Sequence, residues 1–391
     1  MAISDYRIVP YFQPVFAADT GTVWGYEVLG RKVGPEGVES LGPFFHDPHV
    51  PGEEKLAVDR TLRRRALERF KRSGLEARLL LNIQPQWLIP LLTGQKRPPT
   101  LQILEELDLP AERIVIEISE TEFAGDLEQL AELIANYRAA GCGIAVDDLG
   151  SGLSNLDRVS ALRPDLLKVG GTLVTRAVRE EATRYLLRAL GGFAERAGSA
   201  LVIEGVESPN ELRLGLEAGA RFYQGYLLGR PRQDLVREGE YPPLLREECR
   251  RFALEESQLE SWRWAQMRHL EAIVADFSEA NAANLAGYLR RLVPRLPPFC
   301  LRAYVCARNG EQVTPNYERV GDTWVEVPEF LGRNWCWRPY FVGAVAAAGA
   351  GRPTVSESYL DLHTRRRVWT FCRQLGKEWF LFIDVGVDQG K

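Results

Sequence analysis

Two adjacent aspartates, Asp147 and Asp148, end the short apolar run GIAVDD and stand directly before a glycine–serine–glycine turn. An apolar run of this length followed by glycine-rich residues is typical of a buried strand that leaves a sheet. Burying two carboxylates without compensation is costly, so another group must offset their charge. The pair therefore indicates a site at the end of this strand in which carboxylates face cations.

Polar residues also stand at the ends of the other apolar runs in this part of the chain. They are Glu27 after VWGY, Asn82 after LLL, Glu117 in IVIE, Lys168 after DLL, Glu204 after ALVI and Gln224 after RFY. A single carboxylate at a strand end is usually a helix N-cap or a surface residue, but capping does not explain seven strand ends. The carboxyl ends of parallel barrel strands converge on one rim, where enzymes of that fold build their active sites. We therefore predict that these residues share one site.

The residue types of this set indicate its chemistry. Oxygen ligands without histidine or cysteine suit hard cations, Mg²⁺ or Mn²⁺, rather than zinc. Two metal ions about 4 Å apart are a standard solution for phosphodiester cleavage, because one holds the attacking water and both neutralise the phosphate. An aspartate pair at one strand end suits bridging and separating two such ions. The pattern thus favours a metal-dependent phosphodiester site.

The segments around these residues alternate between strand-like and helix-like patterns from residue 8 to about 231. Amphipathic stretches such as DLEQLAELIANYRAA separate the apolar runs, with apolar residues at helical spacing. Strand and helix alternating at this spacing indicate repeated βα units with parallel strands. About seven or eight units are present, which is enough to close a TIM-like (β/α) barrel over residues 1–232.

The pattern changes after Pro231. Residues 233–298 read as a largely helical connector that ends in the proline cluster VPRLPPF. Residues 299–391 contain the strand-like runs CLRAYVCA, TWVEVP, TVSESYLDL, RRVWTFCRQL and EWFLFIDVGV. An antiparallel sheet of about five strands, preceded by helices, resembles a small α+β sensory domain of the PAS or Cache kind.

Composition bounds the possible functions. The chain has 391 residues, 45% hydrophobic and 26% charged, which predicts a soluble protein of two or more domains. A formal net charge of −4 argues against a general nucleic-acid binder. The N-terminus lacks the pattern of a signal peptide, the longest apolar run (341–351) is too short to cross a bilayer, and the six cysteines form no CxxC pair. We therefore expect a cytoplasmic protein with reduced thiols and no membrane or direct nucleic-acid partner.

The motifs resemble those of the EAL-domain family, phosphodiesterases that open cyclic di-GMP to linear pGpG. YFQPVFAADTGTVWGYEVLGR resembles the family opening, with EVL (27–29) in the place of Glu-Ala-Leu. LNIQP, EISE, DDLGSGLSNL, DLLKVG, IEGVE and YQGYLLGRP follow in the family's order and spacing. SLGPFF, NLDRVSALRPDLLK and NWCWRPYF resemble the YkuI-like branch, in which a helical connector and a PAS-like domain follow the EAL domain.

The resemblance implies roles for the residues at the strand ends. The first metal ion would be held by Glu27, Asn82, Glu117 and Asp147, and the second by Asp148. The catalytic residues would be Glu27, Lys168, which orients the water, and Glu204, the general base or a partner of the second metal. Glu120 matches the family glutamate that pins the Asp148 loop; the alternative is an ordinary carboxylate in the first turn of a helix.

The resemblance also implies substrate contacts. They would come from Gln13, Leu29, Arg31, Asp148, Glu207 and Gln224. Arg31 falls where the family's phosphate-binding arginine lies, and a guanidinium suits a bidentate grip on phosphate. Gln13 and Leu29 would line the guanine pocket, although Leu29 is equally compatible with a core position.

One departure from the family pattern bears on catalysis. The family usually has Lys-Ile-Asp where this chain has Lys168, Val169 and Gly170. That aspartate is a ligand of the second metal, and glycine offers no side chain in its place. We therefore predict a weakened second metal site, with slow turnover or a need for high Mn²⁺, unless water or Glu207 takes the place of the aspartate.

Three readings of the function remain open from the sequence. The first is a cyclic di-GMP phosphodiesterase that the C-terminal domain regulates, with a homodimer as the family expectation. The second is a cyclic di-GMP receptor without useful hydrolysis, which Gly170 favours, and the third is an interaction scaffold.

Two smaller features are also ambiguous. NWCWRPYF (334–341) lines either a pocket for an unknown small ligand or a plain core, and His46 and His49 suit a surface or lid loop better than a zinc site.

Overall fold

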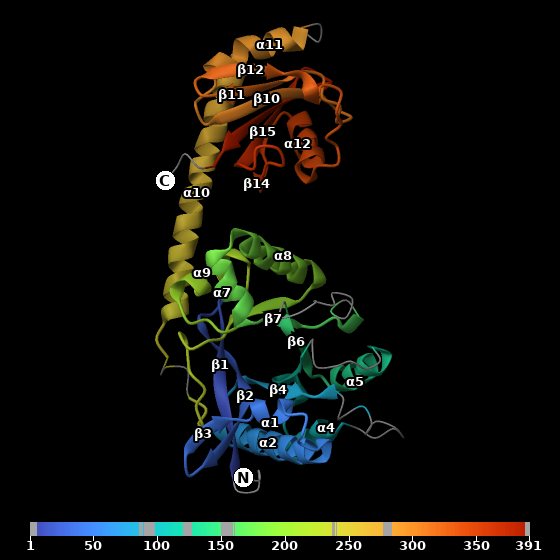
Figure 1. The fold of residues 1–391 in the computed structure, drawn as a ribbon, viewed down its shortest axis with the longest axis vertical. Coiled ribbons are helices and arrows are strands. Elements are labelled where there is room, and N and C mark those ends of the chain that lie inside the picture. The colour runs from blue at the N-terminus through green and yellow to red at the C-terminus, as the bar shows by residue number, and fades with distance from the viewer. Residues whose placement is uncertain are drawn as a thin grey trace. The chain divides into compact units, whose positions relative to one another are not determined.

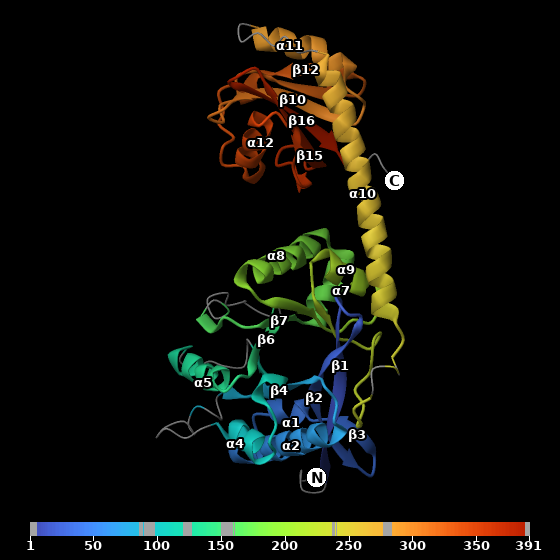
Figure 2. The same cartoon turned by 180° about the vertical axis from the view of Figure 1, so that it is seen from behind.

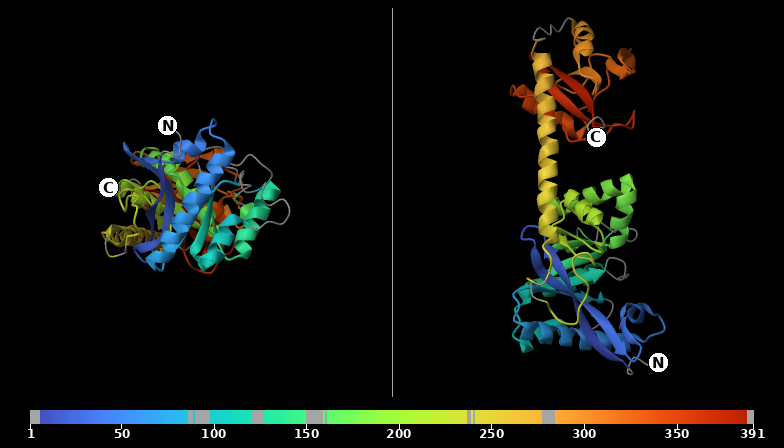
Figure 3. Two further views of the ribbon diagram at one scale, coloured as in Figure 1. Left: turned by 90° about the horizontal axis from the view of Figure 1, so that it is seen from below. Right: turned by 90° about the vertical axis from the view of Figure 1, so that its left-hand side faces the viewer.

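The computed structural model describes residues 6–85, 89, 98–119, 127–149, 159, 161–236, 239, 241–276 and 284–387, with the backbone alone at Asp148 (Figure 1). The chain divides into two compact units, Met1–Leu254 and Glu255–Lys391. The division falls within one long helix, α10 (Leu244–Ala275), which stands out as a single yellow coil in the right panel of Figure 3. Within the described ranges, none of the helices combines the length and apolarity needed to cross a lipid bilayer.

The first unit contains a closed barrel. Its strands are β1 (Arg7–Ala17), β2 (Thr22–Gly34), β4 (Arg78–Ile83), β5 (Ile114–Ser119), β6 (Gly143–Leu149), β7 (Leu166–Val169), β8 (Ala200–Ile203) and β9 (Phe222–Tyr223), and β3 (Gly37–Ser40) extends β2. These strands pair in the order β1-β9-β8-β7-β6-β5-β4-β2, and the pairing of β1 with β2 closes the ring. The TIM-like barrel predicted from the sequence is confirmed.

The helices of this unit lie outside the barrel strands (Figures 1 and 2). They are α1 (Gly42–His46), α2 (Gly52–Ser73), α4 (Pro99–Glu106), α5 (Leu127–Ala139), α7 (Gly171–Arg179), α8 (Glu181–Ala197) and α9 (Pro209–Glu217). Alternate strand residues, such as Leu79 and Leu81 in β4, pack against these helices. The residues between them, such as Leu80, point to the barrel interior. The period of two along a strand thus separates an outer core from an inner one.

One element departs from the expected run of parallel βα units. Strand β1 is antiparallel to both of its neighbours, β2 and β9, and forms a long hairpin with β2, seen as paired blue strands at the right of Figure 3. The remaining barrel strands, from β2 through β9, are parallel. A hairpin needs only a short turn, here residues 18–21, so no crossover helix separates these two strands.

The second unit is built on an antiparallel sheet. Its strands are β10 (Cys300–Ala307), β11 (Asn316–Val320), β12 (Thr323–Val327), β13 (Thr354–Val355), β14 (Tyr359–Leu360), β15 (Arg367–Leu375) and β16 (Trp379–Gly386). The order is β12-β11-β10-β16-β15-β13, with β14 also paired to β15. The expected five strands are seven, because TVSESYLDL divides into two short strands and the polar segment NYERV forms β11.

Both faces of this sheet are covered. Residues of α10 and of α11 (Leu285–Leu292) pack with one set of alternating strand residues, including Val305 and Ile383. Residues of α12 (Pro339–Gly349) pack with the other set, including Tyr304 and Phe382. The apolar segment over residues 341–351 thus provides most of a packed helix of this domain.

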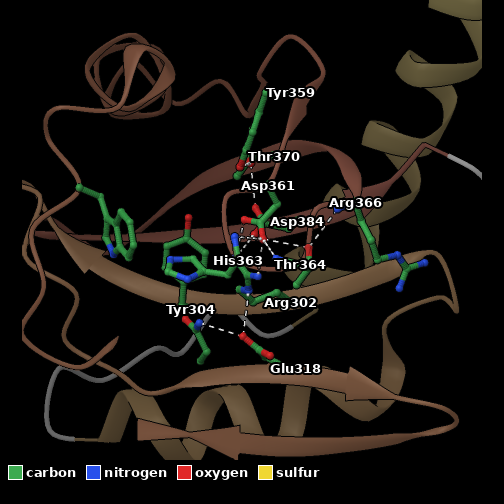
Figure 4. Close-up of polar contacts among 12 residues, drawn as sticks. Arg302, Tyr304, Glu318, Tyr359, Asp361, His363, Thr364, Arg366, Thr370 and Asp384 are labelled. Atoms are coloured by element: carbon green, nitrogen blue, oxygen red, sulfur yellow. Dashed lines mark hydrogen bonds and ion pairs between the residues drawn. The ribbon is translucent and has the colours of Figure 1, made fainter. Parts of the chain in front are cut away.

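A buried ionic cluster lies on the face that α12 covers (Figure 4). Arg302 donates hydrogen bonds of 3.1–3.2 Å to the carboxylates of Asp361, Asp384 and Glu318. Asp361 and Asp384 are only 4% and 2% exposed. Burial raises the pKa of Asp384, whereas in Asp361 the hydrogen bonds from Arg302 overcome that effect and hold the pKa below its usual range. Arg302 therefore stabilises two buried charges at once.

Replacing Arg302 with methionine is expected to destabilise the C-terminal unit by about 3–5 kcal/mol, because two buried carboxylates lose their cation. Urea unfolding followed by circular dichroism measures the change. Arg290→Met is the matched control, since Arg290 makes a solvent-exposed ion pair with Glu326 at 2.9 Å. The control should leave the unfolding midpoint in place, and equal effects of the two substitutions would contradict the prediction.

Candidate metal centre at the carboxyl ends of the barrel strands

Most of the polar residues predicted at the strand ends lie in one layer inside the barrel. Six of them follow an interior residue by two positions: Asn82 after Leu80, Glu117 after Val115, Asp147 after Ala145, Lys168 after Leu166, Glu204 after Val202 and Gln224 after Phe222. The alternation that buries the apolar residue therefore also points the polar residue inward. Register places Asn82 beside Glu117 and Gln13 beside Glu27. Because β1 is antiparallel, Gln13 enters this layer two positions before the interior residue Val15.

Lys168 lies among four carboxylates. Its Nζ atom is 2.6 Å from Glu117 Oε1 and 2.6 Å from Glu204 Oε1. It is also 3.4 Å from Asp147 Oδ2 and 3.6 Å from Glu27 Oε2. The side chains of Lys168 and Glu117 are fully buried. One buried ammonium therefore faces four carboxylates.

Amide side chains join the carboxylates from the other side. Asn82 Nδ2 donates to Glu27 Oε1 at 3.1 Å and to Glu117 Oε2 at 3.0 Å. Gln224 Nε2 donates to Glu27 Oε2 at 2.6 Å and to Gln13 Oε1 at 3.2 Å. These hydrogen bonds hold Glu27 between two amides and fix the orientation of its carboxylate.

The excess of negative charge shifts the protonation equilibria of the layer. Burial raises the pKa of Glu117 well above its usual range, although Lys168 opposes the rise. Burial and the charge of Asp147 raise the pKa of Glu204 in the same way. Burial alone would lower the pKa of Lys168, but the surrounding carboxylates hold it well above its usual range, so this side chain stays charged. The layer carries more carboxylates than its own cation neutralises.

The donor set fits a divalent metal ion. Glu27, Glu117 and Asp147 each offer a carboxylate oxygen, and the three atoms lie within 4.8 Å of one another. Asn82 contacts two of these three residues through its amide. Oxygen donors of this kind are the ligands that Mg²⁺, Mn²⁺ and Ca²⁺ prefer. Among the described residues, this is the one cluster of carboxylate, histidine or cysteine side chains that could hold a metal ion, and neither His46 nor His49 belongs to it.

A pocket of about 290 Å³ adjoins the metal centre. Asn82 and Asp147 belong to both. Of the predicted substrate contacts, Leu29 and Arg31 line the pocket, whereas Gln13, Glu207 and Gln224 are not among its lining residues. Burial lowers the pKa of Arg31, whose guanidinium lies 5.8 Å from the centre of the Tyr11 ring. His46 also lines this pocket, with its Nδ1 atom 2.7 Å from the carbonyl oxygen of Gly42.

One buried ion pair in the pocket wall was not predicted from the sequence. Asp59 and Arg63 of α2 are both buried, and Arg63 Nη1 donates to Thr100 Oγ1 at 2.7 Å. Burial raises the pKa of Asp59, against the effect of Arg63. The sequence did contain a sign that this pair is buried. Asp59 and Arg63 are four residues apart and lie beside the apolar stripe of the helix (Val58, Leu62 and Ala66), not on its solvent face.

Three predicted site residues and the substituted position Gly170 lie apart from this layer or outside the described residues. Glu207 has an exposed side chain, and its backbone N–H donates to Glu211 Oε2 at 2.8 Å. Gly170 is the N-cap of α7, with φ −66° and ψ 148°. The backbone of Asp148 belongs to β6, whereas its side chain and the whole of Glu120 lie outside the described residues.

The segment NWCWRPYF of the second unit lines a separate small cavity. Trp335, Arg338 and Tyr340 are among its lining residues. Trp335 and Tyr340 also pack against a hydrophobic core that includes Phe341, so the segment contributes to both a cavity and a core.

Comparisons with known proteins extend over both units. The family model described as the EAL domain matches residues 1–231, and the model described as an EAL-domain associated signalling protein domain matches residues 235–388. The EAL-domain containing protein YkuI of Bacillus subtilis is 32% identical over 383 residues, which cover 97% of this chain and 94% of YkuI. The cyclic di-GMP phosphodiesterase RocR of Pseudomonas aeruginosa is 30% identical over 232 residues, 56% of each chain.

Solved structures agree with these sequence matches. The crystal structure of Bacillus subtilis YkuI in complex with its substrate c-di-GMP and calcium superposes with a TM-score of 0.85 and 31% identity, covering 99% of this chain and 97% of that one. A standalone EAL protein of Vibrio cholerae, in its c-di-GMP bound form, has a TM-score of 0.53 and 24% identity. It covers 60% of this chain and 96% of its own, and at this identity it supports the barrel fold alone.

Proposed function

Because this chain belongs to the EAL-domain family, we propose that it is a metal-dependent phosphodiesterase that opens cyclic di-GMP to linear pGpG, with turnover weakened by Gly170. The main observation behind this proposal is that the carboxylate cluster shares Asp147 with a pocket that Arg31 lines. The cluster suits a divalent cation and the pocket suits a phosphate-linked nucleotide. In this proposal residues 1–232 are the catalytic barrel, 233–298 the connector and 299–391 the regulatory domain, and two chains form a homodimer.

The metal ions, Mg²⁺ or Mn²⁺, would neutralise the phosphate and make the bound water a stronger nucleophile. Glu27, Asn82, Glu117 and Asp147 would hold the first ion and Asp148 the second. Lys168 Nζ would donate a hydrogen bond that orients the attacking water. Arg31 would bind a phosphate oxygen, and Gln13 and Leu29 would contact the guanine.

Glu204 is the proposed general base. Its Oε1 atom lies 2.6 Å from Lys168 Nζ, so its carboxylate stands beside the group that would orient the water. The water oxygen forms a bond to phosphorus while its proton passes to Glu204, and the bond from phosphorus to the 3′ oxygen breaks. The 3′ oxygen takes a proton from solvent, which leaves a linear dinucleotide with a 5′ phosphate.

A single-turnover assay of cyclic di-GMP with excess protein and Mn²⁺ tests this function. We expect pGpG to form, and we expect Glu27→Ala to slow its formation by about 100-fold or more, because Glu27 is a ligand held by two amides. Glu36→Ala is the matched control, since Glu36 is exposed in the turn between β2 and β3. It should react at the rate of the unaltered protein.

Gly170 supports a second candidate function, a receptor that binds cyclic di-GMP without useful hydrolysis. Tight binding in calorimetry without any pGpG in the single-turnover assay would favour the receptor over the enzyme. Absence of binding at micromolar ligand would contradict both.

A further inference from the structure

The small cavity of the C-terminal unit has walls of two kinds. Arg302, Asp361 and Asp384 form its charged wall, and Tyr304 and Tyr359 are among its aromatic residues (Figure 4). Tyr340 is a third aromatic residue of the lining. Its volume is about 20 Å³. A cavity of that size holds about one water molecule, so a larger ligand must displace a side chain.

The charged wall has an excess of negative charge. Arg302 pairs with Asp361, Asp384 and Glu318, so one guanidinium meets three carboxylates. Asp384 is the most deeply placed of the three, at 2% exposure, and Thr370 Oγ1 also donates to it at 2.8 Å. Burial raises the pKa of Asp384, whereas the charges of Arg302 and Arg338 lower it. A further cation near this wall is therefore favoured and a further anion is disfavoured.

The aromatic wall already holds a cation. The rings of Tyr340 and Tyr359 are stacked, with centroids 5.3 Å apart. The guanidinium carbon of Arg338 lies 4.9 Å from the Tyr359 centroid, 5.7 Å from that of Tyr340 and 5.2 Å from that of Trp337. These distances are those of cation–π contacts.

Arg338 is held there by the rings and hydroxyl groups of Tyr340 and Tyr359 rather than by a direct ion pair. No carboxylate of the described residues lies within ion-pair distance of it, and its Nε atom is buried without a hydrogen-bond acceptor among them. The side chain is half-buried at the boundary of the cavity, next to Trp337, which is 60% exposed. Arg338 can therefore turn to solvent without breaking an ion pair between described residues.

We propose that this cavity binds a small organic cation, a guanidinium or protonated amine compound, which takes the place of the Arg338 side chain over Tyr340 and Tyr359 and faces Asp384. The faces of the two tyrosine rings attract the positive charge of the ligand. The carboxylates around Arg302, which outnumber that one guanidinium, attract it as well. An anionic ligand is disfavoured because Arg302 already forms ion pairs with three carboxylates. Arg338 acts as an internal competitor that keeps the site closed when no ligand is bound.

Methylguanidinium and methylurea are the probes for this site, because they have nearly the same shape and differ in charge. Titration of the full-length protein by calorimetry should show that methylguanidinium binds and methylurea does not. Arg338→Ala should bind methylguanidinium at least about 10-fold more tightly, since a cation–π contact of this kind is worth about that factor and the competitor is gone. Arg333→Ala is the matched control, because Arg333 stacks on Phe330 at 4.6 Å outside the lining of this cavity.

Two substitutions of Tyr359 in the Arg338→Ala background test the aromatic wall. Tyr359→Phe keeps the ring face and should retain the binding of methylguanidinium, whereas Tyr359→Leu removes it and should abolish the gain. Circular dichroism identifies a variant that has not folded, and the Phe and Leu pair keeps the comparison valid because both lose the same hydroxyl. Equal binding of methylurea, binding of acetate that depends on Arg338, or no binding of methylguanidinium to either Arg338 form would overturn the proposal.

Discussion

Replacing Lys168 with methionine is expected to lower the free energy of unfolding of the barrel by about 3–5 kcal/mol in metal-free buffer. The ammonium of Lys168 lies within 3.6 Å of four carboxylates, and two of these contacts are 2.6 Å long. Methionine fills a similar volume but carries no charge. The substitution therefore leaves the buried Glu117 and its neighbours without their cation, which is the costly way to break a buried ion pair.

Divalent cations are expected to return part of this lost stability. Mn²⁺ or Ca²⁺ bound to Glu27, Glu117 and Asp147 would supply the missing positive charge and bind the folded chain alone. Thermal unfolding at increasing metal concentration measures the effect, which should be larger in Lys168→Met than in the unaltered protein. Lys32→Met is the control, because Lys32 pairs with the exposed Glu39 at 3.0 Å. A midpoint that responds to metal no more strongly in Lys168→Met than in this control would contradict the metal centre itself, independently of any activity.

Changing Gly170 to aspartate is expected to raise the rate of cyclic di-GMP hydrolysis about 10-fold or more at limiting metal, by restoring a ligand of the second ion. The backbone angles at this position, φ −66° and ψ 148°, are allowed for any L-residue. Gly170 is also the N-cap of α7 and makes no side-chain cap, so an aspartate there satisfies a free N–H of the first turn. The new side chain therefore costs no backbone strain.

Gly170→Ser separates the two effects of the aspartate. Serine caps a helix about as well as aspartate does but offers no carboxylate to a metal ion. Single-turnover rates and the Mn²⁺ concentration at half-maximal rate should change in Gly170→Asp and stay unchanged in Gly170→Ser. Equal rate gains in both variants would assign the effect to the helix cap. An unchanged rate in Gly170→Asp would show that the missing aspartate does not limit turnover.

The polar layer could be predicted from sequence because a strand has a strict period of two. Asn82, Glu117 and Lys168 each follow an interior apolar residue by two positions, so their inward direction was fixed once the strands were recognised. Gln13 does not follow this rule, because β1 is antiparallel to both of its neighbours. Its layer residue therefore comes before the interior residue in the sequence and not after it. Its place in the site came from the family resemblance alone.

The sequence pattern could not predict the distances between side chains in the site, nor the site residues that lie on a helix. Lys168 was assigned to a water molecule, yet its most direct contacts are the four carboxylates, which only the closed barrel brings within reach. Asp59 and Arg63 lie on a helix, where a charged pair four residues apart usually faces solvent. The C-terminal sheet was underestimated for a related reason, because β11 (Asn316–Val320) is too polar to stand out as a strand.

The antiparallel strand β1 has a consequence for how the chain acquires its site during synthesis. Phe16 pairs with Tyr223, and Phe12 pairs with Arg232, more than 200 positions later. Gln13 also donates to the carbonyl oxygen of Gly229. Contacts of such long sequence separation form late in folding, because loop closure has to precede them. On the ribosome the N-terminal hairpin must therefore wait for residues 222–232 to emerge, and the ring around the carboxylates closes only when most of the barrel has already been made.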